Sequence, residues 1–245
     1  MLDNTIVITY SNTQIHREYQ KEFHKLYHRS FARHIDFTEE DIKASSFWSE
    51  NPQMFQYKKY GGYFLWKSFI IMKTLELYPE NSVLYCDSNL RFTHWKAFEN
   101  SFSSQISSQG TFFVRHENFI NRHWTKRDCF ILMDADSDRY HNANQVWTPL
   151  MGFDNSKRTK ELIQDYMHYC RNPQIVSEEP NLNGENLDGF VEHRWEQSVM
   201  SILVEKYGYR GIPDTQLMNW VTKHYSPELM KMKEEINANP LAKSV

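Results

Sequence analysis

Asp87 and Asn89 stand two residues apart, directly after the apolar run Val83–Cys86. This run predicts a buried strand, which places both side chains at the strand's carboxyl end. Ligands of open α/β sheets bind at that end of the strands. A carboxylate there can hold a divalent cation that neutralises a diphosphate, and the Asn89 carbonyl oxygen is a weaker ligand. The alternative is a simple turn, because Asp, Ser and Asn are all turn formers.

Lys67 lies in the aromatic-rich segment GGYFLWKSF, just after the glycine pair Gly61 and Gly62. Glycines let a backbone come close to a ligand. A lysine in an apolar setting needs a partner, and a phosphate is a natural one. The segment is also typical of a helix start in which Trp66 enters the core and the Lys67 ammonium extends to solvent.

The segment EHRWEQS, Glu192–Ser198, concentrates polar groups. If it is helical, His193 and Gln197 share one face because they are four residues apart. Glu196 could then act as a general base, and His193 could contact a metal or a phosphate. The alternative is a solvated helix start, in which acids lie near the positive end of the helix dipole.

Several common catalytic and metal-binding motifs are incomplete in the sequence or absent from it, which excludes some types of enzyme. The segment DADSD, Asp134–Asp138, is acidic but has neither the glycine nor the distal glutamate of an EF-hand, so it predicts a solvated turn. The sequence has no GxSxG, Walker A or HExxH pattern, and no GxGxxG after a strand. The commonest hydrolase, NTPase, zincin and dehydrogenase types are therefore excluded.

The composition is that of an ordinary globular protein, with 40% apolar and 24% charged residues in 245. The net charge of −3 lacks the basic excess of a sequence-independent nucleic-acid binder, so no nucleic acid is expected as a partner. Cys86, Cys129 and Cys170 are too few and too scattered for a disulfide framework or a CxxC site. We expect no signal peptide and no transmembrane segment, and a cytoplasmic location.

The spacing of apolar residues predicts the elements that position these groups. A strand is predicted at Thr5–Tyr10, and Thr38 with Asp41 matches the capping box of a short helix. Another helix is predicted over Trp66–Leu77, ahead of the strand at Val83. The helix after the first strand is indicated by a three- to four-residue recurrence of Ile15, Tyr19, Phe23 and Leu26. This alternation of strand and helix predicts an α/β sheet that is parallel in its first part.

The second half is less regular. Strands are predicted at Gly110–His116 and Asn144–Phe153, and Thr125 with Asp128 could cap a helix. Further predictions are a surface helix over residues 156–170, a polar loop over 180–189, and a late helix with Trp195, Val199, Ile202 and Leu203 on one face. We expect one domain over residues 1–225 and a polar tail over 226–245.

Six segments occur in the order VITYS, GGYFLWKSFII, VLYCDSN, WTKRDCF, NQVWTPLMGF and HRWEQSVMSIL. Together they resemble a family of small glycosyltransferase-like proteins of bacteria and large viruses, which act in glycan or surface-polysaccharide biosynthesis. The resemblance implies a GT-A-like α/β fold: a single domain with a central mixed, mostly parallel sheet flanked by helices. It also implies transfer of a sugar from a nucleotide-diphosphate donor, with UDP as the commonest nucleotide, to a hydroxyl of a glycan or polysaccharide.

The resemblance implies a role for each matching residue. Asp87 and Asn89 take the metal-binding DxD position, with Mn²⁺ or Mg²⁺ as cofactor, and Glu196 is the catalytic residue. The remaining positions face the donor or substrate: Thr9, Tyr10, Ser11, Tyr63, Trp66, Lys67, Lys126, Asp128, Gln145, His193, Arg194 and Gln197. Three positions depart from the family pattern, namely Ser68 in place of proline, Asn89 in place of the second acid, and Glu196 in place of aspartate.

The mechanism expected from these groups is an inverting transfer. Glu196 would take the proton of the acceptor hydroxyl, and Lys67 or Arg194 would offset the charge on the leaving diphosphate, together with a cation at Asp87. Two alternatives stay open. One is a non-catalytic module that binds a nucleotide sugar or glycan, and the other is a metal-dependent phosphohydrolase that uses the same acids on water.

Overall fold

A computed structural model describes residues 1–224 of the chain, so the tail predicted for residues 226–245 lies outside the described residues. The strands are β1 (Leu2–Ser11), β2 (Phe31–Thr38), β3 (Ser82–Cys86), β4 (Leu90–Phe92), β5 (Thr111–Phe112), β6 (Val114–Ile120), β7 (Asn144–Val146), β8 (Leu150–Phe153), β9 (Ile212–Pro213) and β10 (Val221–Lys223). The helices are α1 (Gln14–Tyr27), α2 (Glu39–Lys43), α3 (Ser46–Glu50), α4 (Pro52–Phe55), α5 (Tyr60–Tyr63), α6 (Leu65–Leu77), α7 (Trp95–Gln109), α8 (Asn121–Trp124), α9 (Arg127–Leu132), α10 (Asp138–His141), α11 (Lys157–Cys170), α12 (Pro173–Val176), α13 (Trp195–Tyr207) and α14 (Asp214–Leu217).

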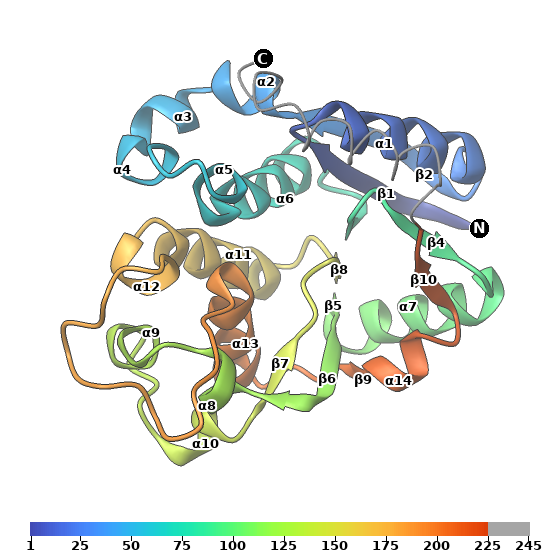
Figure 1. The fold of residues 1–245 in the computed structure, drawn as a ribbon. Helices are drawn as coiled ribbons and strands as arrows, with labels where there is room; N and C mark the ends of the chain where they lie inside the picture. Colours follow the sequence, from blue (N-terminus) through green and yellow to red (C-terminus); the bar gives the residue numbers. More distant parts are fainter. Residues whose placement is uncertain (225–245) are drawn as a thin grey trace.

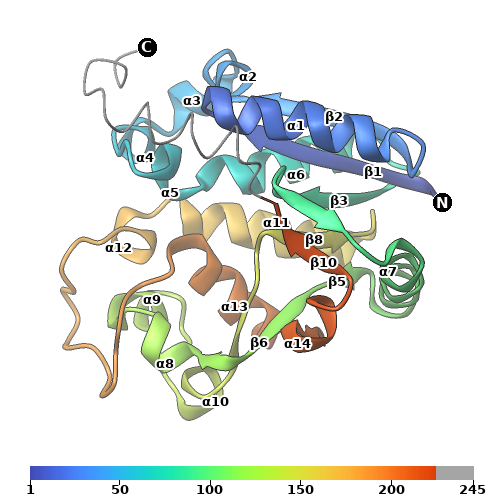
Figure 2. The ribbon, with the colours of Figure 1, turned by 45° about the vertical axis from the view of Figure 1, so that its right-hand side comes forward.

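The central sheet has the strand order β2–β1–β3–β8–β5. β1 runs parallel to both β2 and β3, whereas β8 runs antiparallel to β3 and β5. Two small sheets, β10–β4 and β7–β6–β9, lie beside it. Figures 1 and 2 show α1 on one face of the sheet and α6 with α11 on the other. The predicted α/β class, with a central mostly parallel sheet flanked by helices, is confirmed.

Alternation along the strands divides the core into two clusters. Ile6 and Ile8 of β1 pack with residues of α6, α11 and α13, while Val7 between them packs with Phe23 of α1 and Phe98 of α7. β3 alternates in the same way. Successive strand side chains point to opposite faces, so an apolar run such as VLYC fills both clusters at once. β1 and β3 are therefore buried central strands, which fixes where their carboxyl ends lie.

The elements predicted in the first half of the chain are present, but six others there were not predicted, namely β2, β4, α3, α4, α5 and α7. The helix after the first strand, the capping box of Thr38 and Asp41, and the helix ending at Leu77 are all confirmed. β2 was not predicted. Its sequence FARHIDFT buries only Phe31 and Phe37, so no regular apolar alternation signals an edge strand that pairs with β1.

The two strands predicted in the second half are both interrupted. The first divides at Phe113 into β5 and β6, and the second divides at Trp147–Pro149 into β7 and β8. Pro149 has no N–H to donate to a ladder, which explains the second break. The cap predicted for Thr125 is wrong: α9 begins after Lys126, and the Thr125 hydroxyl accepts a hydrogen bond from Gln145.

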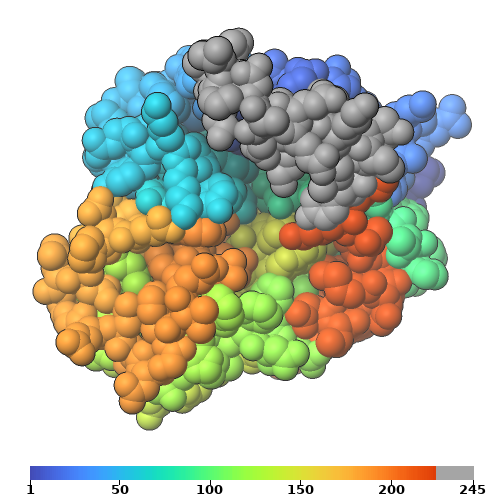
Figure 3. Space-filling view, viewed as in Figure 1, coloured from blue at the N-terminus to red at the C-terminus, as the bar shows by residue number. Residues whose placement is uncertain are grey.

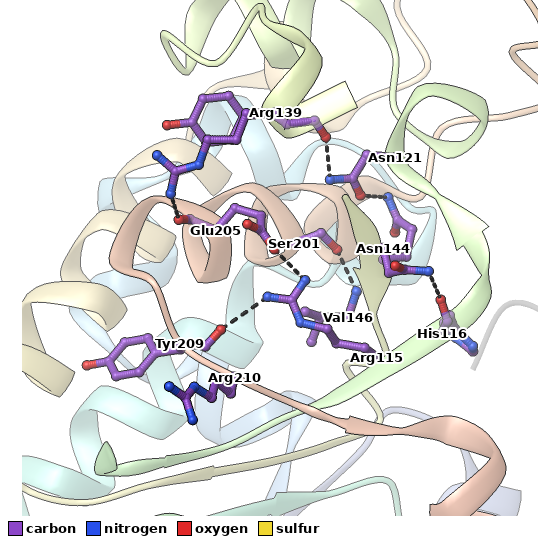
Figure 4. A network of polar contacts seen from close by, with 12 residues as sticks. Arg115, His116, Asn121, Arg139, Asn144, Val146, Ser201, Glu205, Tyr209 and Arg210 are labelled. Carbon is purple, nitrogen blue, oxygen red and sulfur yellow. Dashed lines mark hydrogen bonds and ion pairs between the residues drawn. The ribbon is translucent and has the colours of Figure 1, made fainter. Parts of the chain in front are cut away.

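α13 is buried on more than one face, because every residue from Ser198 to Val204 is buried. A single apolar face was predicted. The small hydroxyl of Ser201 explains how a polar residue fits there: it accepts a hydrogen bond from the Val146 N–H at 2.8 Å and donates one to the Gln197 carbonyl at 2.6 Å. Figure 4 shows this contact within a polar network that ties α13 to β6 and β7.

Gly152 of β8 has no room for a side chain. A Cβ there would lie 2.4 Å from the Phe102 ring and 2.9 Å from the Phe112 Cβ. Gly152→Ala is expected to lower the free energy of unfolding by about 1–3 kcal/mol, the usual cost of overpacking. Urea denaturation measures this. Phe102→Leu in the same background should recover part of the loss, and a wild-type unfolding free energy for Gly152→Ala would contradict the packing described.

Candidate active site

A pocket of about 180 Å³ opens at the carboxyl ends of β1 and β3. These two strands are parallel neighbours in the sheet, so their ends meet at one edge. The lining residues come from both strand ends, from α1 and from the segment between α4 and α6: Tyr10, Asn12, His16, Tyr60, Phe64, Trp66, Tyr85, Asp87, Ser88 and Asn89. Four of the predicted site residues, Tyr10, Trp66, Asp87 and Asn89, are thus brought together.

Asp87 is held in a defined position at the edge of this pocket. Its Oδ1 accepts a hydrogen bond from the Tyr85 hydroxyl at 2.6 Å, and its N–H donates to the Pro149 carbonyl at 2.8 Å. The Leu90 N–H donates back to the Asp87 carbonyl at 3.0 Å and closes a turn. Both interpretations of the sequence therefore apply, since the segment is a turn and it also lines a pocket.

Two further residues, Arg91 and Tyr85, hold this turn in place. Arg91 is buried and donates to the carbonyls of Ser88 at 2.7 Å and Leu90 at 2.8 Å. Burial, and secondarily the charge of Asp87, raises the pKa of the Tyr85 hydroxyl well above its usual range. Tyr85 is therefore a neutral donor at all ordinary pH values. Tyr85 was not among the predicted site residues. Its position two residues before Asp87 already places it on the same face of the strand, so this contact could have been predicted.

The opposite wall of the pocket is aromatic. Tyr10 stacks on Trp66 with ring centroids 3.6 Å apart, and the Trp66 indole N–H donates to the Tyr60 carbonyl at 3.1 Å. Tyr60 stacks in turn on Phe64 at 4.5 Å. Such rings offer flat apolar faces to a base or a sugar ring.

The residues that carry this wall form a left-handed turn. Five consecutive residues, Tyr60 to Phe64, have φ between 51° and 77°. The N–H of Tyr63 donates to the Lys59 carbonyl and the N–H of Phe64 to the Tyr60 carbonyl, which is the four-residue bonding of a helix with the opposite hand. Only Gly61 and Gly62 adopt this conformation freely, and each other residue costs about 1–2 kcal/mol. The glycine pair was predicted to allow close approach of a ligand or to precede a helix, and the left-handed turn itself was not predicted.

Lys67 and Glu196 form a buried ion pair beneath the pocket. The Lys67 Nζ lies 2.7 Å from the Glu196 Oε1, and the side chains are only 3% and 4% exposed. The Thr148 hydroxyl donates to the same Oε1 at 3.0 Å. The ammonium lies 4.8 Å and 5.0 Å from the ring centroids of Phe64 and Tyr85, two of the pocket-lining residues. The partner of Lys67 in the structure is thus Glu196, and Lys67 does not extend to solvent.

A second group of predicted residues lies apart, around a pocket beside the segment 177–193. Lys126 donates from its Nζ to the Glu179 carbonyl at 2.6 Å, and from its N–H to the His193 Nδ1 at 3.2 Å. The His193 Nε2 pairs with the Ile175 carbonyl at 2.9 Å. Burial, and secondarily the Lys126 charge, lowers the pKa of His193 to about 3, so its ring is neutral.

The predicted helical face shared by His193 and Gln197 is wrong, because α13 begins only at Trp195. Both ring nitrogens of His193 are engaged by backbone groups, so the described conformation gives it a packing role. Gln197 instead donates to the Oε1 of Gln145 at 3.0 Å, and Gln145 is fully buried.

Asp128 anchors the polar loop that follows Pro180. Its carboxylate accepts hydrogen bonds from the N–H groups of Leu182 at 2.7 Å and Asn183 at 2.9 Å, and from the side chains of Asn183 and Gln174. Burial alone would raise the pKa of this carboxyl, but these hydrogen bonds outweigh burial and lower it below its usual value. Asp128 is therefore satisfied by the protein itself and does not line the pocket at Asp87.

Loss of the Asp128 charge is expected to release this loop. Because the folded-state pKa lies below the unfolded value of about 3.9, the stabilisation is complete above that pH and is lost as pH falls through the folded pKa. Asp128→Asn should speed amide exchange at Leu182 and Asn183 by about 10- to 100-fold near neutral pH. Hydrogen-exchange mass spectrometry measures this, with the exposed Glu185→Gln of the same loop as control. Equal exchange in both variants would contradict the anchoring role.

The other predicted site residues lie outside the pocket lining. Thr9 donates to Asp36 at 2.7 Å and accepts from Gln20, and the Ser11 hydroxyl is buried without a partner. Strand alternation turns these two side chains away from Tyr10. Tyr63 is buried, and Arg194 pairs with Glu192 at 2.8 Å while lying over the Trp124 ring. The lining residues that sequence reasoning missed are Asn12, His16, Tyr60, Phe64, Tyr85 and Ser88.

The groups at the end of β3 fit a divalent cation that is shared with a substrate. Asp87, Ser88 and Asn89 supply oxygen donors of the hard type that Mg²⁺ and Mn²⁺ prefer. Within residues 1–224, no three or more His, Cys, Asp or Glu residues are grouped so that they could hold a metal. Such an ion would therefore need phosphate oxygens and water to complete its shell, as Mg²⁺ commonly does.

Comparison with known proteins gives fold-level similarity only. Models of protein families and the sequences of characterised proteins both gave no match. Among solved structures, the chain is similar to a glycosyltransferase involved in the glycosylation of the major capsid of PBCV-1, at 13% identity, 96% and 99% coverage of the two chains and a TM-score of 0.45. It is also similar to apo mouse xyloside xylosyltransferase 1, at 9% identity, 85% and 83% coverage and a TM-score of 0.45. Neither value is high enough to transfer an activity or a residue role.

None of the helices in the described part of the chain combines the length and the apolar character that crossing a bilayer requires.

Proposed function

We propose that the protein is a glycosyltransferase that moves a sugar from a nucleotide-diphosphate donor, a UDP-sugar in the simplest case, to a hydroxyl of a glycan or polysaccharide. The observation that carries this proposal is the pocket at the carboxyl ends of β1 and β3, where Asp87 faces an aromatic wall. The motif order in the sequence supports it, because the segments VITYS, GGYFLWK and VLYCDSN supply that pocket.

The two sides of the pocket suit the two parts of such a donor. Tyr10, Asn12 and His16 line it at the end of β1, where rings and polar groups can take a base and a ribose. Asp87, Ser88 and Asn89 line it at the end of β3 and take the diphosphate side. A divalent cation held by Asp87 and Asn89 would supply positive charge there, which a diphosphate next to a carboxylate requires.

In the proposed transfer, the acceptor oxygen attacks the anomeric carbon of the donor sugar. The bond from that carbon to the diphosphate oxygen breaks, its electron pair leaves with the nucleotide diphosphate, and the acceptor proton passes to a base. Glu196 is the proposed base. Lys67 and Thr148 both contact its Oε1, so Oε2 is the oxygen that would take the proton. Attack from the face opposite the leaving group would invert the anomeric configuration.

Burial of Glu196 is the observation that favours a second candidate, a non-catalytic module that binds a nucleotide sugar or glycan. A carboxylate that is 4% exposed and paired with an ammonium can serve the fold alone. A metal-dependent phosphohydrolase, which would use Asp87 on a water, is the third candidate.

One experiment separates the three candidates. The protein is incubated with a panel of nucleotide sugars and Mn²⁺, and free nucleotide is followed with and without glycan acceptors. A transferase releases nucleotide faster when an acceptor is present. Donor binding with no release at all would indicate the binding module, and release that is independent of acceptor would indicate the phosphohydrolase.

A further inference from the structure

We propose that Tyr60, Phe64 and Trp195 form the subsite for the sugar ring of the acceptor, at the mouth of the pocket. The inference deepens the proposed function, because it names where the second substrate binds. Two of these residues, Tyr60 and Phe64, begin and end the left-handed turn.

The turn imposes a backbone cost that packing alone does not explain. Three of its five residues are Tyr60, Tyr63 and Phe64. The left-handed conformation costs each of them more conformational free energy than it would cost a glycine at the same position. Strain of this kind persists where the surroundings enforce it, and it is concentrated at binding sites. Its geometric effect is to place Tyr60 and Phe64 on one side of the turn, with rings stacked at an interplanar angle of 16°.

Trp195, the first residue of α13, packs against the same two rings. Its ring centroid lies 4.7 Å from that of Tyr60 and 6.4 Å from that of Phe64. Trp195 carries two costs of its own, a φ of 48° and a buried indole N–H without a partner. Phe64 and Trp195 also pack against the core, but strain on both sides of one aromatic cluster is typical of binding sites.

The cluster is accessible, unlike the rest of the aromatic wall. Tyr60 is 41% exposed, whereas Trp66 is 4% and Tyr10 is 9% exposed. Lys59 braces the turn by pairing with Glu178 and by lying 4.8 Å above the Trp195 ring. Figure 3 shows the segment around residues 50–65 resting directly on the segment around 170–195 on this face. Tyr60 therefore stands at the rim, while Phe64 and Trp195 connect the rim to the core.

The position of the rim favours an acceptor over a donor. The proposed donor occupies the pocket between Asp87 and Tyr10, so an acceptor must approach from its mouth, where Tyr60 and Phe64 also line it. Flat aromatic rings bind the apolar C–H face of a sugar without fixing its hydroxyls. The Lys67 ammonium links the rings to the proposed base, since it lies 4.8 Å from the Phe64 ring centroid and 2.7 Å from the Glu196 Oε1.

The matched variants Tyr60→Leu and Tyr60→Phe test the subsite. Tyr60→Leu removes the ring, and Tyr60→Phe keeps it. In the transfer assay, Tyr60→Leu should raise the acceptor KM by about 5- to 10-fold, the usual size of one aromatic contact, and leave the donor KM unchanged. Tyr60→Phe should stay close to wild type. Tyr78→Leu, at the far end of α6, is the control for loss of a partly buried tyrosine, and thermal unfolding reports on the fold of each variant.

Each outcome has a distinct meaning. A raised donor KM with an unchanged acceptor KM would assign the rings to the nucleotide, and unchanged values for both would make them structural; either result overturns the subsite but leaves the transferase standing. If wild type uses no donor, the proposed function fails. In that case saturation-transfer NMR with methyl glycosides still decides the subsite: a signal that Tyr60→Leu loses supports it, and no signal overturns it.

Discussion

Replacing Asp87 with asparagine is expected to lower the rate of sugar transfer by about 10²–10³-fold, which is the usual loss when one electrostatic stabiliser is removed from an active site. Asparagine keeps the size of the side chain and an oxygen that can accept from Tyr85. It removes the single formal charge that the segment from Asp87 to Asn89 presents to the pocket. The rate constant kcat, measured with saturating donor and Mn²⁺, reports the loss.

Asp138→Asn is the matched control, because the Asp138 side chain is 91% exposed and stands at the first position of α10. Its transfer rate should equal that of wild type. The unfolding midpoints of both variants should stay close to that of the parent. A wild-type rate for Asp87→Asn would exclude Asp87 from the donor site.

The buried pair of Lys67 and Glu196 is expected to give the second large effect. Removing one partner from a buried ion pair leaves the other charge uncompensated and typically costs about 3–5 kcal/mol. Lys67→Met and Glu196→Gln should each approach that loss in unfolding free energy. The double variant Lys67→Met with Glu196→Met should regain most of it, because no buried charge is left.

The same variants separate the structural role of Glu196 from its proposed catalytic role. If Glu196 is the base, Glu196→Gln should lower kcat by about 10²–10⁴-fold, even under conditions where the variant is fully folded and binds donor normally. Near wild-type turnover under those conditions would remove Glu196 from the base role. A double variant no more stable than either single one would show that the two side chains do not act as a pair.

The parts of the site that depend on local sequence could be predicted. Asp87 follows an apolar run with no interruption, so its place at a strand end needs only the burial pattern of Val83–Cys86. The capping box of Thr38 and Asp41 is likewise a signal four residues long. Such elements depend on residues that are close together in the chain, so the local sequence is sufficient to predict them.

The parts that depend on distant contacts could not be predicted. Lys67 and Glu196 are separated by 129 positions, and the sequence around either residue does not indicate which residue it pairs with. The left-handed turn runs against the preference of three of its own residues, so local propensity predicts a different conformation. Asp128 and His193 were predicted to contact the donor, whereas their contacts in the structure are to the loop backbone and to Ile175, which only the folded chain brings near.

Mass-spectrometric detection of the glycosylated product tests the proposed glycosyltransferase activity most directly. Wild-type protein and Asp87→Asn are incubated side by side with a nucleotide-sugar panel, Mn²⁺ and a glycan acceptor panel. The account predicts that wild type adds one sugar residue to the mass of an acceptor and releases nucleotide diphosphate in equal amount, while Asp87→Asn adds about 10²–10³-fold less in the same time. No mass increase on any acceptor, from folded protein that binds a donor, would contradict it.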